Sequence, residues 1–370
     1  MFIKTIRLKN FRNYESLDLD FSKNINVLYG ENAQGKTNIL ESIFLCASGR
    51  SHRTSKDAEM VMVGKNGYVV ELIVRRKDRD VKIEICYDLN ERKKIRINEI
   101  PEKKIGSLIG NLNAVIFSPE DLDIIKDGPS ARRRFLDITI SQISPGYFYD
   151  LQQYGKILAN RNYLLREIPK NSKLIDTLDI WSRNLADVGS RIIIARQKFI
   201  RNINLKLRKN HSKLTAGKES LELVYRPSVN ICELEYEKEI AEIFFKTLQK
   251  ERQKEILKAT TLYGPQRDDF DLMLNKMDVK LYGSQGQQRT CVLSVKLSEV
   301  DIMQEETGEL PVLLLDDVMS ELDNNRQEFL LNSIKDIQVF VTCTNKNIFL
   351  HDNIHGIRFF KVEKGEVVRQ

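Results

Sequence analysis

One octapeptide constrains the fold of this chain more than any other feature. Residues 30–37 read GENAQGKT, directly after the short apolar run 25–29 and before a helical pattern of apolar residues. The two glycines let the backbone turn so that several N–H groups point at phosphate oxygens. Lys36 would supply a charge for the β and γ phosphates, and Thr37 would offer a hydroxyl to Mg²⁺. A strand, this loop and a helix predict an α/β fold that binds a nucleoside triphosphate. The predicted nucleotide-binding residues of the loop are Gly30, Glu31, Asn32, Ala33, Gln34, Gly35, Lys36 and Thr37.

A second motif supplies the acidic partner of this loop. The apolar residues 312–315 are followed by Asp316 and Asp317. Such a run fits a central parallel strand whose carboxylates emerge at its C-terminal edge, where α/β sheets bind ligands. We expect Asp316 to hold the Mg²⁺ shell through water, together with Thr37, and Asp317 to orient or deprotonate the attacking water. Lys36, Asp316 and Asp317 are therefore the predicted catalytic residues, with ATP and Mg²⁺ as cofactors.

A third motif, Ser-Gln-Gly-Gln at residues 284–287, precedes the acidic strand and opens a helical run. Ser284 is a natural N-cap, and Gly286 lets a backbone approach closely. Alone, this pattern is often only a helix cap. Its place before the acidic strand is typical of ATP-binding-cassette ATPases, in which the serine meets the γ-phosphate held by a second copy. We therefore expect Ser284, Gly286 and Gln287 to contact nucleotide in an ATP-dependent homodimer.

A helical insertion separates the glycine loop from the acidic strand. Apolar residues recur at spacings of three and four from Tyr147 to Leu165 and again from Leu174 to Leu207. This pattern predicts two long helices packed as an antiparallel hairpin. The predicted organisation is an α/β ATPase head built from both chain ends (1–120 and 260–370), with an antiparallel β subdomain at about 58–115 and a helical-hairpin arm domain at 121–259.

Composition narrows the function classes. With 41% hydrophobic and 30% charged residues, the chain can build a hydrophobic core, and its composition is not that of a disordered protein. No run of 18 apolar residues predicts a spanning helix, and the N-terminus lacks the pattern of an export signal, so we expect a cytoplasmic protein with no membrane partner. Five scattered cysteines without a CxxC pair fit reduced thiols and offer no zinc site.

The positive charge is concentrated in one segment. The net charge is +7, and residues 191–213 carry eight basic side chains and no acid, so the rest of the chain is nearly neutral. Such a run is often only a solvated helix face, but a one-signed stripe repels itself unless an anion offsets it. No base-reading motif is present, so we expect sequence-independent binding to DNA phosphates. The predicted DNA-binding residues are Arg191, Arg196, Lys198, Arg201, Lys206, Arg208 and Lys209, and Lys213 completes the run.

Seven motifs in order along essentially the whole chain resemble the bacterial RecF family of the SMC-like ABC ATPases. They are 10–14, 30–37, 48–53, 117–122, 128–137, 264–269 and 314–317. The resemblance implies a weak, DNA-stimulated ATPase that binds double-stranded and gapped DNA. It implies action with RecO and RecR to load RecA at single-strand gaps, in replication-linked repair and the SOS response. It also suggests that Arg12 and Asn13 contact the nucleotide.

Four features depart from the usual patterns. Asp317 stands where many cassette ATPases have a glutamate base, and its shorter arm predicts slow hydrolysis, suited to a switch. No glutamine occupies the Q-loop position, where Glu120 is a candidate substitute. No histidine follows the strand at 339–342, where Thr342 or Thr344 could serve. Gln266 replaces the histidine usual in the family's Gly-Pro-His-Arg-Asp-Asp.

Some alternatives stay open from the sequence. Arg50 and His52 fit either a functional loop or a solvated one, and the basic run 132–134 fits either a phosphate or DNA patch or a helix start that pairs with nearby acids. An ATP-coupled nuclease with an SMC-like head would need a further carboxylate-rich domain, for which no segment is left over. A transporter ATPase subunit would need no basic arm, because its helical insertion would dock on a membrane partner.

Overall fold

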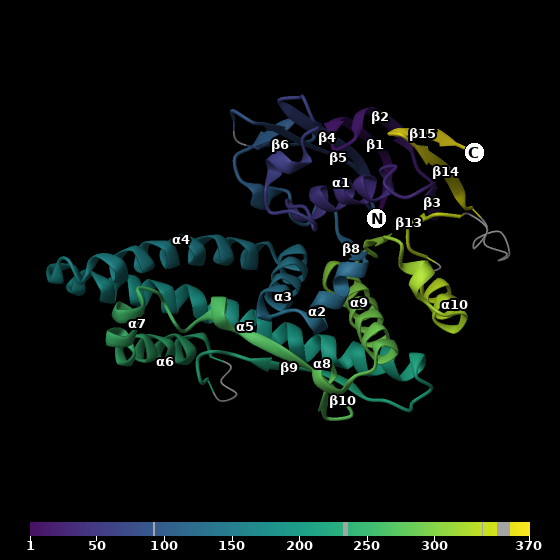
Figure 1. Cartoon of the computed structure of the whole chain (residues 1–370). Helices are drawn as coiled ribbons and strands as arrows, with labels where there is room; N and C mark the ends of the chain where they lie inside the picture. The colour runs from purple at the N-terminus through teal and green to yellow at the C-terminus, as the bar shows by residue number, and fades with distance from the viewer. Residues whose placement is uncertain (92, 232–235, 335, 346–355) are drawn as a thin grey trace. The chain divides into compact units, whose positions relative to one another are not determined.

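The computed structural model describes the chain from residue 1 to 370 except 92, 232–235, 335 and 346–355. The chain divides into two compact units (Figure 1). We call Met1–Asp121 with Lys296–Gln370 the head unit, and Leu122–Val295 the arm unit. As predicted, the head unit is built from both chain ends. The division differs from the predicted boundary at 260–295, which lies in the arm unit.

A six-stranded, mainly parallel sheet forms one layer of the head unit, in the order β15-β14-β3-β13-β12-β8. Its strands are β3 (Ile25–Tyr29), β8 (Ala114–Phe117), β12 (Val312–Leu315), β13 (Val339–Cys343), β14 (Arg358–Glu363) and β15 (Glu366–Arg369). The predicted acidic strand β12 lies between the parallel strands β8 and β13, and all its residues are buried. Strands β14 and β15 form a hairpin that turns at Lys364 and Gly365, which have φ of 49° and 81° as a tight hairpin turn requires.

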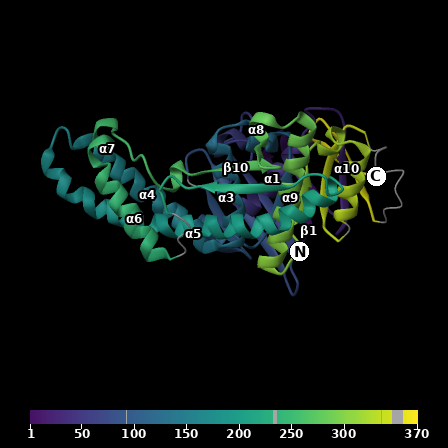
Figure 2. The same ribbon diagram turned by 90° about the horizontal axis from the view of Figure 1, so that it is seen from below.

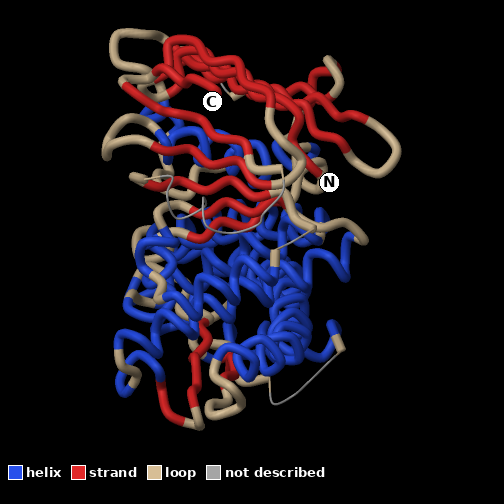
Figure 3. Tube along the Cα trace, turned by 90° about the vertical axis from the view of Figure 1, so that its right-hand side faces the viewer, coloured by secondary structure: helices blue, strands red, loops and turns tan. Residues whose placement is uncertain are grey.

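A six-stranded antiparallel sheet forms the second layer, in the order β2-β1-β4-β5-β6-β7 (Figure 3). Its strands are β1 (Phe2–Phe11), β2 (Tyr14–Asp20), β4 (Gly67–Arg75), β5 (Asp80–Asp88), β6 (Lys94–Ile97) and β7 (Ile100–Glu102). Residues alternate between buried and partly exposed along β4, the pattern of a sheet with one face on the core. Helix α1 (Lys36–Ser48) contacts strands of both sheets, so nearly all its side chains are buried. The helix that follows the glycine loop is therefore held from both sides.

Short elements complete the head unit. They are the 3₁₀ turns η1 (Asp57–Met60), η2 (Ile105–Ser107), η3 (Pro119–Leu122, its last residue in the arm unit) and η6 (Val318–Glu321), the helix α10 (Asn324–Ser333), and the C-terminal part of α9 (Gln285–Thr307), which begins in the arm unit.

The arm unit contains the predicted helical hairpin. Helices α4 (Pro145–Glu167) and α5 (Ile175–Leu214) run side by side, as Figures 1 and 2 show. With 40 residues, α5 is about 60 Å long. The sequence also predicts one charged helix from Glu233 to Lys258. The structure instead has two helices, α6 (Glu237–Lys250) and α7 (Arg252–Lys258), and residues 233–235 lie outside the described residues. The other helices and 3₁₀ turns are α2 (Asp123–Lys126), α3 (Pro129–Ile143), η4 (Ser172–Leu174), η5 (Pro265–Arg267) and α8 (Val279–Tyr282).

A small antiparallel sheet explains the unit boundary. Strand β10 (Asp269–Leu274) pairs with β9 (Leu221–Arg226) along its whole length and with the short β11 (Met277–Asp278). Residues after 260 are thereby tied to the arm through backbone hydrogen bonds. Strands β9 and β10 are far apart in sequence, so their pairing leaves no local signal. The sequence prediction therefore assigned residues 260–295 to the head from the spacing of the motifs alone.

The hairpin is fastened by a fully buried ion pair. Arg161 on α4 donates to Oε2 of Glu255 on α7 at 2.7 Å, and both side chains are completely buried. The remaining guanidinium N–H groups reach Ser182 on α5 at 3.0 Å and Thr261 at 2.7 Å. A buried charge pair is tolerated only when its polar atoms are satisfied in this way. The network therefore fixes α7 against both helices of the hairpin.

Candidate functional site

The glycine loop joins β3 to α1 at the carboxyl edge of the parallel sheet. Gly30 and Gly35 have φ of 153° and 114°, and Ala33 also has a positive φ of 63°. A Cβ on Gly30 would lie 2.2 Å from the carbonyl oxygen of Val362, and one on Gly35 would lie 2.5 Å from Nδ2 of Asn13. Space and conformation therefore both require glycine at the two ends of the loop.

Side chains from the antiparallel sheet hold the loop in place. Asn13 Nδ2 donates to the carbonyl oxygen of Gln34 at 2.9 Å, and the buried Tyr14 hydroxyl donates to that of Gly35 at 3.0 Å. Asn38 Nδ2 in turn donates to Asn13 Oδ1 at 2.8 Å. Asn13, which we expected to touch the nucleotide, thus contacts the backbone of the loop that would bind it.

Lys36 begins α1 and is 96% buried, with an exposed fraction of 4%. Its Nζ donates to the carbonyl oxygens of Gly30 and Glu31, both at 2.8 Å, so the charge lies over the loop. Helix α1 has neither a side-chain cap nor an acidic residue in its first turn. Its first N–H groups and its positive dipole end are therefore suited to an anion.

The two chain ends meet at Asp316. Thr37 Oγ1 donates to Asp316 Oδ1 at 2.8 Å, and Thr342 Oγ1, at the end of β13, donates to the same oxygen at 2.7 Å. Burial raises the pKa of Asp316 above its ordinary value, and the two hydroxyl donors oppose this shift. A hydroxyl and a carboxylate in contact are the hard oxygen donors that Mg²⁺ prefers, with its other ligands coming from water and phosphate. The residues present therefore fit this ion.

Asp317 directly follows Asp316 and has a left-handed backbone, with φ of 52°. Its N–H donates to Thr342 Oγ1 at 2.9 Å, which holds the residue in this uncommon conformation. Thr342 thus contacts both aspartates. Of the two threonines that could stand in place of the histidine, the structure brings Thr342 to the acidic pair, while Thr344 is exposed.

Arg12, which is partly exposed, forms an ion pair with the buried Glu41 within the head unit. Its guanidinium donates to both carboxylate oxygens of Glu41 on α1, at 2.8 and 2.6 Å, and to the carbonyl oxygen of Glu59 at 2.6 Å. Ser51 Oγ donates to the same carboxylate at 2.5 Å. Burial raises the pKa of Glu41, but the donors from Arg12 and Ser51 outweigh it and hold this pKa below its ordinary value. Sequence reasoning missed Glu41, which unites the motifs 10–14 and 48–53.

The predicted signature residues lie in the arm unit. Ser284 Oγ accepts from the N–H of Gln287 at 3.3 Å, and Gln287 Oε1 accepts from the N–H of Ser284 at 3.0 Å. This reciprocal pair is a capping box at the start of α9, so the predicted N-cap is confirmed. Ser284 and Gly286 are exposed, while Gln287 is half-buried.

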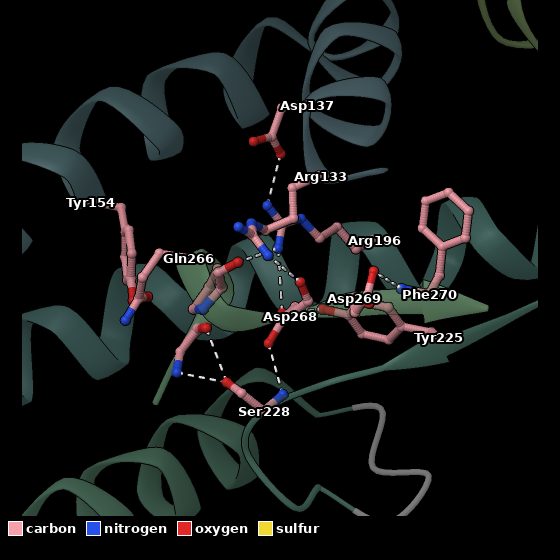
Figure 4. Close-up of polar contacts among 12 residues, drawn as sticks. Arg133, Asp137, Tyr154, Arg196, Tyr225, Ser228, Gln266, Asp268, Asp269 and Phe270 are labelled. Carbon is pink, nitrogen blue, oxygen red and sulfur yellow. Dashed lines mark hydrogen bonds and ion pairs between the residues drawn. The ribbon is translucent and has the colours of Figure 1, made fainter. Parts of the chain in front are cut away.

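The prediction that Arg196 binds DNA is wrong. Its exposed fraction is 1%, and its guanidinium donates to Asp137 at 2.8 Å and to Asp268 at 3.3 Å (Figure 4). Tyr225 also donates to Asp268, which accepts from the N–H of Ser228 at 2.8 Å. Asp137 and Asp268 lie far from Arg196 in sequence, which is why the run appeared free of acids.

A signal for this burial was present in the sequence. Arg196 falls on the apolar seam of α5, at the spacings of four and three that connect Ile192, Phe199 and Ile203. A basic residue on such a seam needs a buried acidic partner. The heptad position, rather than the local charge, would have identified Arg196 as part of the core.

Other members of the basic run differ in their surroundings. Arg191 pairs with Asp150 at 2.8 Å and Glu237 at 3.7 Å, and Arg208 lies 3.5 Å from Glu222. Acids from neighbouring elements thus offset part of the repulsion that the sequence predicted. Four predicted DNA-binding residues are exposed along one face of α5, with Lys206 half-buried beside them. The exposed residues are Lys198, Arg201, Arg208 and Lys209.

The remaining motifs have structural partners. Arg132 pairs with both oxygens of Asp269 at 2.6 and 2.9 Å, and Arg133 donates to the carbonyl oxygen of Asp268 at 2.8 Å. Both contacts favour the interpretation of a helix start that pairs with acids. Gln266 accepts a hydrogen bond from the Tyr154 hydroxyl, so an amide at this position holds α4 without an imidazole.

Comparison with known proteins places the chain in a family. Residues 2–367 match the model described as RecF/RecN/SMC N terminal domain. The DNA replication and repair protein RecF of Acetivibrio thermocellus is 52% identical over 99% of both chains, and that of Ruminiclostridium cellulolyticum is 49% identical over 99% of both. The chain belongs to the RecF family. The resemblance predicted from the motifs is thereby confirmed.

Solved structures agree with the RecF assignment. A structure described as the recombination mediator protein RecF with ATP in the RecFOR pathway has a TM-score of 0.94 at 41% identity, covering 100% of this chain and 97% of that one. The Smc head domain of Pyrococcus furiosus has a TM-score of 0.56 at 17% identity, covering 100% and 96%, and shares the fold. The predicted SMC-type fold class is therefore confirmed. Among the described residues, no helix is long and apolar enough to cross a membrane.

The contacts of Thr342 give a first prediction. Thr342→Val keeps the side-chain volume but removes the hydroxyl that joins Asp316 to the N–H of Asp317. We expect ATP hydrolysis to fall by about 10- to 100-fold and the free energy of unfolding by about 1–3 kcal/mol, because a buried N–H loses its acceptor. Steady-state kinetics and denaturant unfolding measure the two effects. Thr342→Ser, which retains the hydroxyl, is the control. Unchanged hydrolysis by Thr342→Val would contradict the role of the Thr342 hydroxyl in holding the two aspartates.

Proposed function

We propose that the chain is an ATP-dependent DNA-binding protein of recombinational gap repair. The observation that carries this proposal is the contact of Thr37 with Asp316 at the uncapped start of α1. Membership in the RecF family, with a relative described in complex with ATP, supports it. This membership also favours the proposal over an ATP-coupled nuclease or a transporter subunit.

The nucleotide would bind along the glycine loop. Lys36 would exchange the carbonyl oxygens of Gly30 and Glu31 for the β and γ phosphates. Thr37 and Asp316 would hold Mg²⁺, which neutralises charge on the phosphates. Asp317 would orient water, and its short arm fits slow hydrolysis that resets a switch. Arg12 and Asn13 would support nucleotide binding indirectly. Arg12 would do so by holding Glu41 on α1, and Asn13 by holding the backbone of the glycine loop.

Two copies would associate around the bound nucleotide. Ser284, Gly286 and Gln287 of one copy would contact the γ-phosphate held by the other, because the capping box leaves Ser284 at the exposed start of α9. ATP would then favour the dimer through these contacts, and hydrolysis would remove them. We propose that this dimer acts at single-strand gaps with RecO and RecR to load RecA, in support of replication and the SOS response; a relative described as a recombination mediator of the RecFOR pathway supports this.

DNA would bind through the exposed basic face of α5. Lys198, Arg201, Arg208 and Lys209 lie on it with the half-buried Lys206 beside them, whereas Arg196 belongs to the core. Contacts to phosphates from flexible basic side chains carry no sequence information. We therefore propose binding to double-stranded and gapped DNA without sequence preference, and stimulation of hydrolysis by DNA.

Dimer formation tests the nucleotide site and the signature motif together. In gel filtration with Mg-ATP at micromolar protein, we expect the natural chain to be a dimer. Lys36→Met should be a monomer, because it lacks the amine that would contact the β and γ phosphates. Ser284→Arg should bind ATP but raise the dimer Kd at least ~30-fold, because a bulky charge replaces a central contact. Ser172→Arg places the same side chain at an exposed serine on η4 and should dimerise normally. A natural chain that stays monomeric refutes the proposed role of Ser284.

The salt dependence of duplex binding tests the basic face. Reversing Lys198, Arg201 and Lys209 to Glu should reduce the slope of log K against log salt by about 2–3, because each lost phosphate contact removes about one unit. The matched control reverses three exposed lysines elsewhere in the arm unit, Lys170, Lys173 and Lys250, with the same change in net charge. Equal slopes for the two triple variants would show that DNA binds elsewhere.

A further inference from the structure

A chain of polar contacts connects the end of α5 with the start of α9. Glu219 lies in the loop between α5 and β9, and its Oε1 accepts from Nε2 of Gln287 at 2.7 Å. Its other oxygen, Oε2, lies 3.4 Å from Nε2 of His211, in the last turn of α5. Nδ1 of His211 lies 2.9 Å from Oγ of Ser294 on α9. All these residues belong to the arm unit.

Ser294 and Glu219 lie at the two ring nitrogens of His211. Ser294 Oγ is 2.9 Å from Nδ1 and 2.8 Å from the carbonyl oxygen of Thr290, and Glu219 Oε2 is 3.4 Å from Nε2. Burial lowers the pKa of His211 below its ordinary value, although Glu219 opposes this, so the ring is neutral near pH 7.

Glu219 is the charged group that lies against His211. From α9, the ring faces the hydroxyl of Ser294, and the nearby Cys291 is a neutral thiol, since burial, with a smaller effect of Glu219, raises its pKa to about 12. The shorter contact of Glu219 is the hydrogen bond from Gln287, at 2.7 Å, against 3.4 Å to the ring of His211. The carboxylate is thus directed at the signature motif.

A nucleophilic triad is the other chemistry that serine, histidine and glutamate suggest. Here Ser294 and His211 are both completely buried. A nucleophile must reach a substrate, so this arrangement cannot act as one. The contacts instead place a charge from the α5–β9 loop against Gln287.

We propose that Glu219 is a positioning residue for the signature motif, and that it orients Gln287 and the capping box of α9 for contact with the nucleotide of a second copy. The proposal rests on the proposed function, because it assumes that this motif forms the ATP-dependent dimer. Gln287 Oε1 caps Ser284 while its Nε2 is held by Glu219, so the amide is fixed at both ends. His211, in the last turn of α5, lies 3.4 Å from the other oxygen of this carboxylate.

The test compares dimerisation with nucleotide binding in the natural chain, Glu219→Ala and Glu219→Gln. We expect the dimer Kd in Mg-ATP to rise at least tenfold for Glu219→Ala, because a hydrogen bond to a charged group is lost, and less for Glu219→Gln, which keeps an acceptor. ATP affinity of the monomer should stay within twofold. Glu222→Ala removes an exposed carboxylate on β9 and should leave both values unchanged.

Proton NMR of the four histidines supplies a second readout. The His211 signal is assigned by its loss in His211→Gln. Because Glu219 raises the pKa of His211, Glu219→Gln should lower it further, which checks in solution that the carboxylate lies against the ring.

The outcomes separate the two proposals. A natural chain that stays monomeric with ATP refutes the proposed function and this inference with it. A natural chain that dimerises while Glu219→Ala dimerises equally well refutes the inference alone, as does an unchanged His211 pKa in Glu219→Gln.

Discussion

The hydrogen bond between Thr37 and Asp316 is the interaction on which the account of this chain depends. It joins residues 279 positions apart, one from each end of the chain, at the carboxyl edge of the parallel sheet. The sheet makes this possible because β12 and β3 both pair with β13, which brings the acidic strand level with the glycine loop. Thr342, at the end of β13, then bonds both aspartates. One oxygen of Asp316 thus accepts hydrogen bonds from two hydroxyl groups, one at the start of α1 and one at the end of β13.

The arm unit is organised by buried charge. Arg161 meets Glu255, and Arg196 meets Asp137 and Asp268, each with its polar atoms satisfied by further donors and acceptors. Such pairs give little net stability compared with apolar residues, but they allow few alternative packings. Removing one partner would leave an uncompensated charge in the core. Arg196 connects two of the sequence motifs that resemble the family. It pairs with Asp137 of the motif 128–137 and with Asp268 of the motif 264–269 (Figure 4).

Local patterns in the sequence predicted the local structure. The glycine loop, the acidic strand, the helical hairpin and the cap at Ser284 each have a signal within a few residues, because strand burial, helical period and capping are short-range effects. Contacts between distant segments have no such signal. Arg12 with Glu41, Arg196 with Asp268 and Glu219 with Gln287 were therefore missed. The placement of 260–295 was missed for the same reason, since only the pairing of β10 with β9 decides it.

We propose that Thr37 and Asp316 together would hold Mg²⁺ beside the glycine loop. Calorimetric titration of ATP into the natural chain and into Thr37→Val, each with Mg²⁺ and with a chelator, tests it most directly. The account predicts that Mg²⁺ tightens ATP binding by the natural chain and that Thr37→Val loses most of this dependence, because the hydroxyl that faces Asp316 is gone. An equal effect of Mg²⁺ on both proteins would contradict the account.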